Sequence, residues 1–247
     1  MANVEAHTRA PMPGYVTKQE SLEIAGADDI VIRSLLDRQQ FSDPLGVAER
    51  LGISSAAWPL FGLPWPSGAE LAAHLLARPQ RAGERILEIG CGLALASLAV
   101  HRRGDDVTAS DCHPLAESFL ASNLRLNALP AMKYRHGHWG GVPASTEPAW
   151  NGAAPSVFGR FDLVIGSDVL YERDADGSLA HFIDAHAEVD AEVWIVDPDR
   201  GNRAAFNRRM KEHGFDLHEE RLDRAASGRS PAYKGRLLVY RRGEARQ

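Results

Sequence analysis

The tightest constraint on the fold lies between residues 85 and 100. An apolar run, 86–89, contains a single acidic residue, Glu88, and leads into two closely spaced glycines, Gly90 and Gly92, and a second apolar run. This order predicts a buried strand, a tight turn and a helix. Because glycine has no Cβ, it suits a sharp turn or the close approach of a ligand. The free N–H groups of the next helix would face the same turn, so the turn is either a nucleotide-like ligand site or a turn without a ligand.

Beyond residue 84 the chain alternates strand and helix patterns, which implies a parallel sheet covered on both faces. We expect an α/β fold with a doubly wound, mostly parallel seven-stranded sheet and an antiparallel C-terminal strand pair. Gly214 should end the last long helix. The expected strands are 85–89, 106–111, 132–136, 161–166, 192–196, 215–220 and 236–240, and the expected helices are 94–102, 114–127, 178–187 and 202–213.

The first 83 residues predict a small extension packed on a core of residues 84–247. A loose tail to residue 14 precedes a β-hairpin, 15–20 with 29–34, and a short helix at 47–51. Residues 58–68 are rich in Trp, Pro and Gly, so they form either a loop packed on the core or a wall of a ligand pocket. Ser67 is a candidate N-cap for a helix over 69–76.

Charge and cysteine usage exclude several classes of protein. The chain has 247 residues and a net charge of −5, which argues against a general binder of nucleic acid or anionic membranes. Cys91 and Cys112 form neither a CxxC pair nor a disulfide framework. The N-terminus lacks the apolar core of a signal peptide, and no apolar stretch reaches the roughly 18–20 residues of a membrane span. These features favour a cytoplasmic protein.

Polar and aromatic residues follow the predicted strands at the edge where ligands bind doubly wound sheets. Asp111 ends the second strand, about twenty residues beyond the glycines, an offset that suits hydrogen bonds to ribose hydroxyls; the alternative is a helix N-cap. Trp139 follows the third strand and could stack on an adenine ring. Asp168 and Tyr171 follow the fourth strand and can face one cleft if the segment starts a helical turn. Their alternatives are an N-cap and a packed aromatic ring.

Metal chemistry is not expected. Cys112 and His113 are adjacent rather than at zinc-finger spacing. A Mg²⁺ site formed by Asp168 with Asp197 or Asp199 is a minor alternative.

The glycine turn distinguishes two classes of nucleotide-binding protein. A dinucleotide fold would carry G-x-G-x-x-G, and Leu95 occupies the position of the third glycine. Glu88-x-Gly90-x-Gly92 instead resembles motif I of the class I, seven-strand methyltransferases, which use S-adenosylmethionine (SAM). The sequence departs from that motif at Ala94, where many members have glycine.

A narrower resemblance rests on several motifs together: Trp65-Pro66-Ser67-Gly68, Asp111, Asn123 with Asn127, Trp139-Gly140 and Ser167-Asp168-Val169-Leu170-Tyr171. From about Tyr15 onward the chain resembles methyltransferase family 16, which contains lysine methyltransferases and bacterial members described as nicotinamide N-methyltransferase-like. The resemblance implies a Rossmann-like methyltransferase fold and places Asp168 and Tyr171 at the acceptor. It implies a SAM site lined by Trp65, Glu88, Gly90, Gly92, Asp111, Trp139 and Ser167.

The segment Asp197–Arg200 differs from many eukaryotic members, so the acceptor does not carry over with the resemblance. The favoured activity is methyl transfer from SAM, with S-adenosylhomocysteine as the other product, to a protein lysine. The alternatives are a small-molecule N- or O-methyltransferase and a SAM-binding scaffold without activity. An amine must be neutral to attack, whereas a free lysine has a pKa near 10.4. An aromatic cleft would lower that pKa by desolvation, and Asp168 would orient the amine.

Overall fold

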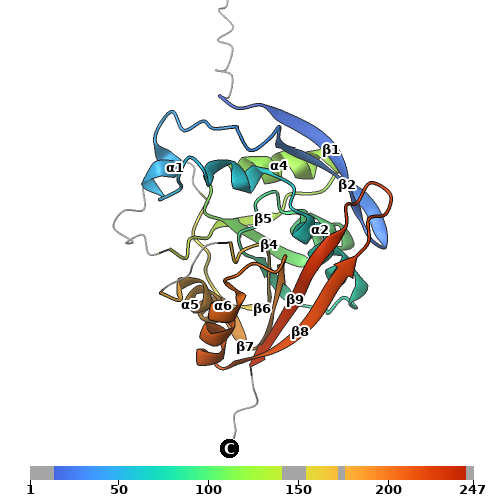
Figure 1. The fold of residues 1–247 in the computed structure, drawn as a ribbon, viewed down its shortest axis with the longest axis vertical. Coiled ribbons are helices and arrows are strands. Elements are labelled where there is room, and N and C mark those ends of the chain that lie inside the picture. The colour runs from blue at the N-terminus through green and yellow to red at the C-terminus, as the bar shows by residue number, and fades with distance from the viewer. Residues whose placement is uncertain (1–13, 141–153, 172–175, 243–247) are drawn as a thin grey trace, which may run out of the picture.

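The protein is described by a computed structural model that covers residues 14–140, 154–171 and 176–242 (Figure 1). Its main sheet has seven strands in the order β5-β4-β3-β6-β7-β9-β8. Neighbouring strands from β5 to β7 are parallel, and β9 runs antiparallel to both β7 and β8. The strands are β3 Arg85–Glu88, β4 Asp106–Asp111, β5 Lys133–His136, β6 Phe161–Ser167, β7 Ala187–Asp197, β8 Phe215–Arg224 and β9 Tyr233–Arg242. The predicted fold class is confirmed.

Helices cover both faces because successive strand residues point to opposite sides. Ile86 packs in the core beneath the first group of helices, and Leu87 packs in the second core on the other face. The first group is α2 Pro66–Ala77, α3 Leu95–Arg103 and α4 Ala116–Leu126, and the second is α5 Ser178–His186 and α6 Arg203–Glu212. Gly214 follows α6 with φ +81°, the left-handed conformation predicted for the residue that ends it. None of the helices in the described ranges is long and apolar enough to cross a bilayer.

The N-terminal hairpin consists of β1 Thr17–Ile24 and β2 Ala27–Leu35 and lies along the outer side of the first helix group (Figure 1). Two asparagines of α4 hold it by its backbone. Asn127 accepts a hydrogen bond from Val31 N at 2.9 Å and donates one to Val31 O at 2.7 Å. Asn123 accepts one from Arg33 N at 2.8 Å. Both asparagines therefore dock the hairpin rather than line the pocket.

The aromatic segment between the hairpin and α2 has two roles. The short helices α1 Val47–Arg50 and η1 Trp58–Gly62 precede α2. Trp58 is 1% exposed and packs against Tyr15 and Phe61, so it belongs to the core, whereas Trp65 borders a pocket. Both predictions for residues 58–68 therefore apply: one part packs on the core, and another part borders the pocket.

The N-cap prediction for Ser67 is wrong. The helix α2 begins at Pro66, whose fixed φ suits the first helical position, and Trp65 is the N-cap residue without a side-chain bond. Ser67 Oγ instead lies 3.0 Å from the hydroxyl of Tyr233. This contact crosses from α2 to β9, a pairing that local sequence does not reveal.

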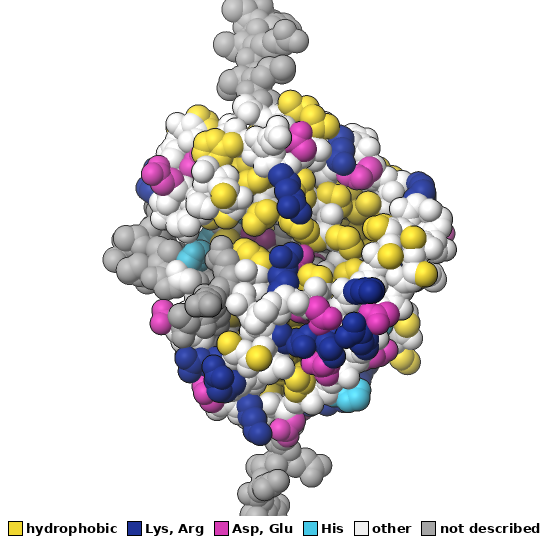
Figure 2. All heavy atoms as spheres, in the orientation of Figure 1, with side chains coloured by type: hydrophobic (Ala, Val, Ile, Leu, Met, Phe, Trp, Pro, Cys, Tyr) yellow, Lys and Arg dark blue, Asp and Glu magenta, His cyan; other side chains and the backbone are white. Residues whose placement is uncertain are grey.

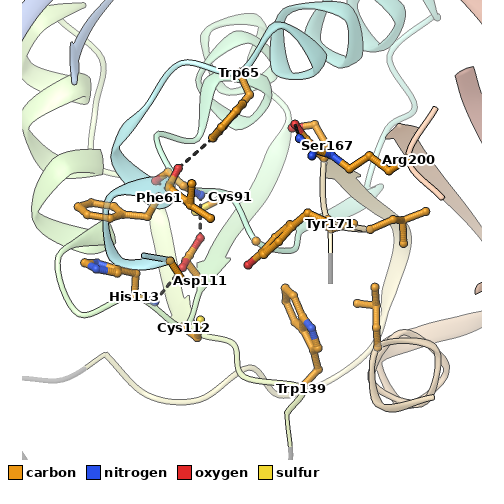
Figure 3. Close-up of a pocket in the computed structure, with 18 of the residues that line it drawn as sticks. Phe61, Trp65, Cys91, Asp111, Cys112, His113, Trp139, Ser167, Tyr171 and Arg200 are labelled. Atoms are coloured by element: carbon orange, nitrogen blue, oxygen red, sulfur yellow. Dashed lines mark hydrogen bonds and ion pairs between the residues drawn. The ribbon is translucent and has the colours of Figure 1, made fainter. Parts of the chain in front are cut away.

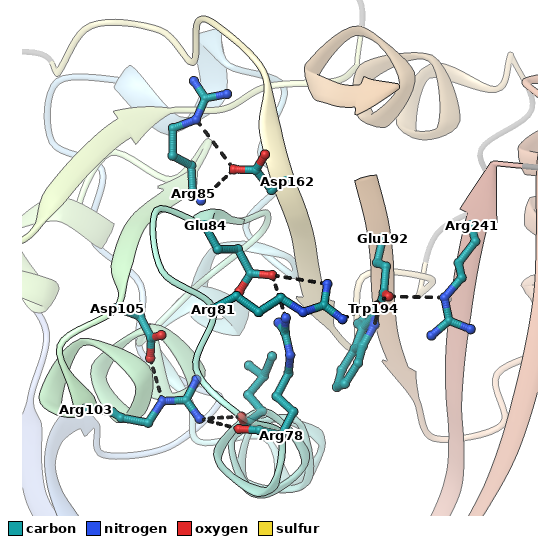
Figure 4. Close-up of polar contacts among 11 residues, drawn as sticks. Arg78, Arg81, Glu84, Arg85, Arg103, Asp105, Asp162, Glu192, Trp194 and Arg241 are labelled. Atoms are coloured by element: carbon teal, nitrogen blue, oxygen red, sulfur yellow. Dashed lines mark hydrogen bonds and ion pairs between the residues drawn. The ribbon is translucent and has the colours of Figure 1, made fainter. Parts of the chain in front are cut away.

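The amino-terminal edge of the sheet is held by ion pairs (Figure 4). Arg78 pairs with the buried carboxylate of Glu84 at 2.5 Å just before β3. Arg103 pairs with Asp105 and also donates hydrogen bonds to the carbonyl oxygens of Leu75 and Arg78 at the end of α2. These contacts fix the loops at the edge opposite the ligand site.

Several bounds differ from prediction. The strand β7 starts at Ala187 rather than at residue 192, because a register irregularity between Phe161 and Leu163 of β6 allows pairing to begin earlier. The strands β8 and β9 are also longer than predicted. The predicted tail up to residue 13 and most of the predicted loop 140–159 lie outside the described residues. The division at residue 84 stays a prediction.

Candidate active site

A pocket of about 1160 Å³ opens at the carboxyl ends of β3, β4, β6 and β7 (Figure 3). The strand order reverses at β3, which has β4 on one side and β6 on the other, and such switch points form ligand crevices. All nine site residues proposed from the sequence line this one pocket: Trp65, Glu88, Gly90, Gly92, Asp111, Trp139, Ser167, Asp168 and Tyr171.

The turn after β3 requires its glycines. Gly90 and Gly92 have φ of +57° and +51°, the region that favours glycine. A Cβ on Gly92 would lie 2.8 Å from the backbone oxygen of Phe61, and one on Gly90 would lie 3.1 Å from the ring of Trp139. Ala94 also has a left-handed φ, +58°, where many family members carry glycine. The turn thus keeps its shape at a cost of about 1–2 kcal/mol at Ala94.

Glu88 joins this turn to the next helix. It is 1% exposed, and its carboxylate accepts a hydrogen bond from Ser97 N at 2.9 Å in the first turn of α3. This bond satisfies one of the free N–H groups at the helix start. Burial, and to a lesser degree the negative charge of Asp111, raise the pKa of Glu88 to about 7.

Asp111 fixes the turn from the neighbouring strand. One oxygen accepts a hydrogen bond from Gly92 N at 2.8 Å and the other from His113 N at 2.7 Å. The helix α4 begins later, with Leu115 as its N-cap residue, so Asp111 is not its cap. Burial raises the pKa of Asp111 in spite of these bonds. Within the described residues neither Asp111 nor Glu88 has a salt bridge, so this end of the pocket suits a positively charged ligand.

Aromatic rings border the pocket on two sides. In Figure 3, Trp65 and Trp139 lie on opposite sides and the ring of Tyr171 projects between them. The Trp65 indole donates to Leu60 O at 2.9 Å, and Trp139 packs beside Phe182 at a ring separation of 6.0 Å. Each tryptophan is thus held from behind and presents a surface to the pocket.

Asp168 directly follows β6, as predicted, but neither the helical turn nor the N-cap considered for it is found. Its φ is +57°, and its N–H bonds to Val196 O at 2.8 Å, so no helical turn starts here. It is not an N-cap either, because α5 begins at Ser178. The carboxylate instead forms a bidentate salt bridge with Arg200, in which Nε lies 2.6 Å from Oδ1 and Nη2 lies 3.0 Å from Oδ2. Sequence reasoning missed this partner of Asp168.

The sequence does contain a signal that Arg200 lies near Asp168. It follows β7, the strand next to β6, in the segment noted for departing from family members, and its own N–H bonds to Asp197 at 2.9 Å. Side chains after adjacent parallel strands meet at one edge of the sheet.

Sequence reasoning also missed the packing role of His113 beside Asp111. Its ring stacks on Phe61 at 3.6 Å and 11°, and its Nδ1 accepts a hydrogen bond from Leu115 N at 3.2 Å. Burial lowers the pKa of His113 to about 3, so the ring is neutral. Within the described ranges, no group of three His, Cys, Asp or Glu side chains is arranged to hold a metal ion.

Comparison with known proteins agrees with this geometry. The structure of magnesium protoporphyrin IX methyltransferase from Synechocystis PCC 6803, with bound SAH, superposes with a TM-score of 0.52 at 15% identity, covering 71% of this chain and 81% of that one. That likeness concerns the fold.

The sequence profile for lysine methyltransferases matches residues 62–213. Together with the fold and the glycine turn, this match defines a SAM-dependent methyltransferase. The chain belongs to the lysine methyltransferase family. The electron transfer flavoprotein beta subunit lysine methyltransferase of Rattus norvegicus is 26% identical over 194 residues, 76% of this chain and 69% of the relative. The EEF1A lysine methyltransferase 3 of Mus musculus is 25% identical over 193 residues, 75% and 71% of the two chains.

Proposed function

We propose that this enzyme transfers a methyl group from SAM to the side-chain amine of a lysine in a protein. The observation that carries the proposal is the family match over residues 62–213, which spans every proposed site residue. The relatives named above act on two different proteins, so the family supports the lysine and leaves the target protein to experiment. We also propose a cytoplasmic location, which suits two cysteines that form no disulfide.

The charges of the pocket fit SAM. The cofactor carries a cationic ammonium and a cationic sulfonium, and Glu88 and Asp111 offer two buried carboxylates without a cationic partner among the described residues. Asp111 ends β4 and lines the pocket, a position that suits a carboxylate accepting hydrogen bonds from the ribose hydroxyls. We assign the adenine to the space beside Trp139 and the amino-acid part to the turn at Gly90 and Gly92.

The acceptor end of the pocket lies at Asp168 and Tyr171. When bound, SAM supplies a methyl group on a good leaving group, so the chain need only align the amine at about 3–3.5 Å and exclude water. Tyr171 is 46% exposed, which suits a side chain that guides an acceptor in from solvent. Asp168 orients the amine and balances the charge that passes from sulfur to nitrogen.

The deciding experiment uses SAM with a labelled methyl group and a lysate of the host. Label should enter protein, and hydrolysis of that protein should release methyllysine. The matched control is Asp168→Asn, which keeps the size of the side chain and should label little. Label confined to small molecules would establish the alternative acceptor class, and absence of transfer with SAM bound would favour a scaffold.

A further inference from the structure

Arg200 lines the acceptor end of the pocket and pairs with Asp168. Its guanidinium covers both oxygens of Asp168, at 2.6 and 3.0 Å. The side chain of Asp168 is 9% exposed and that of Arg200 is 38% exposed, so the arginine lies between the carboxylate and solvent. Both residues line the same pocket as Tyr171. Figure 3 labels Arg200 and Tyr171 in this pocket.

A bare carboxylate would harm transfer to an amine. An opposite charge within about 4–6 Å favours the charged form of a titrating group, and a buried site strengthens that preference. A lysine beside an unpaired Asp168 would therefore stay an ammonium, whose nitrogen has no lone pair for attack. The acceptor site needs a carboxylate that can orient the amine but does not hold its extra proton.

We propose that Arg200 is a positioning residue that tunes acceptor selection: it neutralises Asp168 so that the site accepts a neutral amine and disfavours an ammonium. The inference rests on the proposed transfer to lysine. The guanidinium also adds a positive charge near the incoming nitrogen, which favours loss of its proton to water at the pocket mouth.

The reacting atoms balance under this arrangement. The ammonium first gives one proton to water. The nitrogen lone pair then forms the N–C bond while the C–S bond breaks and its electrons stay on sulfur. The positive charge moves from sulfur to nitrogen within the pocket that Asp168 and Arg200 line.

The other charged groups around the pair do not replace Arg200. Asp197 at the end of β7 is fully buried, bonds to Arg200 N, and has a raised pKa because of burial. Tyr233 of β9 is a neutral neighbour whose pKa burial also raises. The further charges that reach this cluster are Glu70 of α2, Asp199 and Arg203. Of the two arginines, Arg200 and Arg203, only Arg200 bonds to Asp168 in the described part of the chain.

Arg203 supplies the matched control. It stands three residues from Arg200 but pairs with Asp199 and Glu219. Basic and acidic side chains are mixed over β8 and β9, at the lower right of Figure 2. Arg203→Gln removes the same charge from the same segment without touching Asp168. Arg200→Lys keeps the charge at Arg200 but loses the two-pronged geometry.

The first test needs no turnover. The protein is saturated with S-adenosylhomocysteine at pH 7, and the affinity of n-butylammonium, a mimic of a lysine head group, is measured by NMR titration. Arg200→Gln should bind it about tenfold more tightly than the wild type, because a neighbouring charge shifts such an equilibrium by about one pH unit or more. Arg200→Lys should fall between them, and Arg203→Gln should match the wild type. Equal affinity in the wild type and Arg200→Gln, or an equal gain in Arg203→Gln, would overturn the inference.

The second test measures kcat/KM against pH on the methylated lysine substrate. In Arg200→Gln the rising limb should move to higher pH by about one unit relative to the wild type and to Arg203→Gln. An unmoved limb contradicts the role given to Arg200 even if lysine is the acceptor. If no lysine is methylated but n-butylammonium binding responds as expected, the proposed function fails and the charge-neutralising role of Arg200 stands.

Discussion

The carboxylates at the two ends of the pocket have different partners. At the glycine turn, Glu88 and Asp111 are buried, bond to backbone N–H groups, and have no salt bridge among the described residues. At the acceptor end, Asp168 is covered by the guanidinium of Arg200. Burial raises the pKa of both turn carboxylates. This contrast supports the proposed assignment of SAM, a permanent cation, to the first end and of the acceptor amine to the second.

The largest expected effect separates the two ends by function. Asp168→Asn should lower single-turnover methyl transfer to an amine by about one to three orders of magnitude, because it removes charge where positive charge develops on nitrogen. The affinity for S-adenosylhomocysteine, measured on the same preparation, should stay within about twofold, since we propose that Asp168 acts on the acceptor. Full activity would remove Asp168 from the acceptor site, and a matching loss of cofactor affinity would show that the two ends are not independent.

The next effect tests the end of the pocket at the glycine turn, which we propose binds the cofactor and call the cofactor end. Asp111→Ala should weaken S-adenosylhomocysteine binding by about 1.5–3 kcal/mol, the range for hydrogen bonds to a charged group. The loss includes the bond that holds Gly92 N at 2.8 Å. Calorimetry on a folded variant is the measurement, with Asp168→Asn as the control that should bind normally. Unchanged affinity would count against ribose binding, and tight NAD binding without SAM binding would overturn the assignment of this pocket.

A smaller effect concerns the raised pKa of Glu88. Its folded pKa of about 7 lies above its ordinary value of 4.5, so the folded protein binds more protons between these pH values than the unfolded chain. Stability without cofactor should therefore fall as the pH rises from 5 to 8, by roughly 2 kcal/mol. Glu88→Gln, which keeps the bond to Ser97 N, should flatten this dependence in urea unfolding measured at both pH values. An identical slope in wild type and variant would mean that Glu88 is ionised in the folded protein well below pH 7.

Saturating S-adenosylhomocysteine gives this prediction a second arm. Its ammonium should favour ionised Glu88, so the cofactor complex should lose less stability with rising pH than the free protein.

The geometry of the glycine turn could be predicted from sequence because it depends on local interactions. Glycine at positions 90 and 92 follows from the turn itself, and Asp111 lies at the next strand end in the chain. Even Ala94 keeps the left-handed conformation of the motif in which it replaces glycine. The resemblance to a family also indicated that Trp65 borders the pocket, whereas the sequence alone did not decide between a packed loop and a pocket wall.

The acceptor end could be predicted only in part. Asp168 and Tyr171 were placed in the pocket, but the partner of Asp168 lies 32 residues away at the end of another strand. Which of several charged side chains at one sheet edge form a pair depends on rotamers and on the backbone, here a left-handed φ at Asp168 that a non-glycine residue seldom adopts. The contact of Ser67 with Tyr233 escaped prediction for the same reason, since it joins segments 166 residues apart.

The smallest expected effect tests whether the two tryptophans belong to the cofactor end. Trp139 lies against Gly90, and Trp65 borders the opposite side of the pocket, so adenine stacked on either ring should change its fluorescence. Titration with S-adenosylhomocysteine should give a signal that is lost when both are replaced by Phe. Trp58 should contribute little to that signal, because it is 1% exposed within the aromatic core and does not line the pocket. An undiminished signal in the double variant would assign Trp65 and Trp139 to packing and restrict the cofactor end to the turn and its two carboxylates.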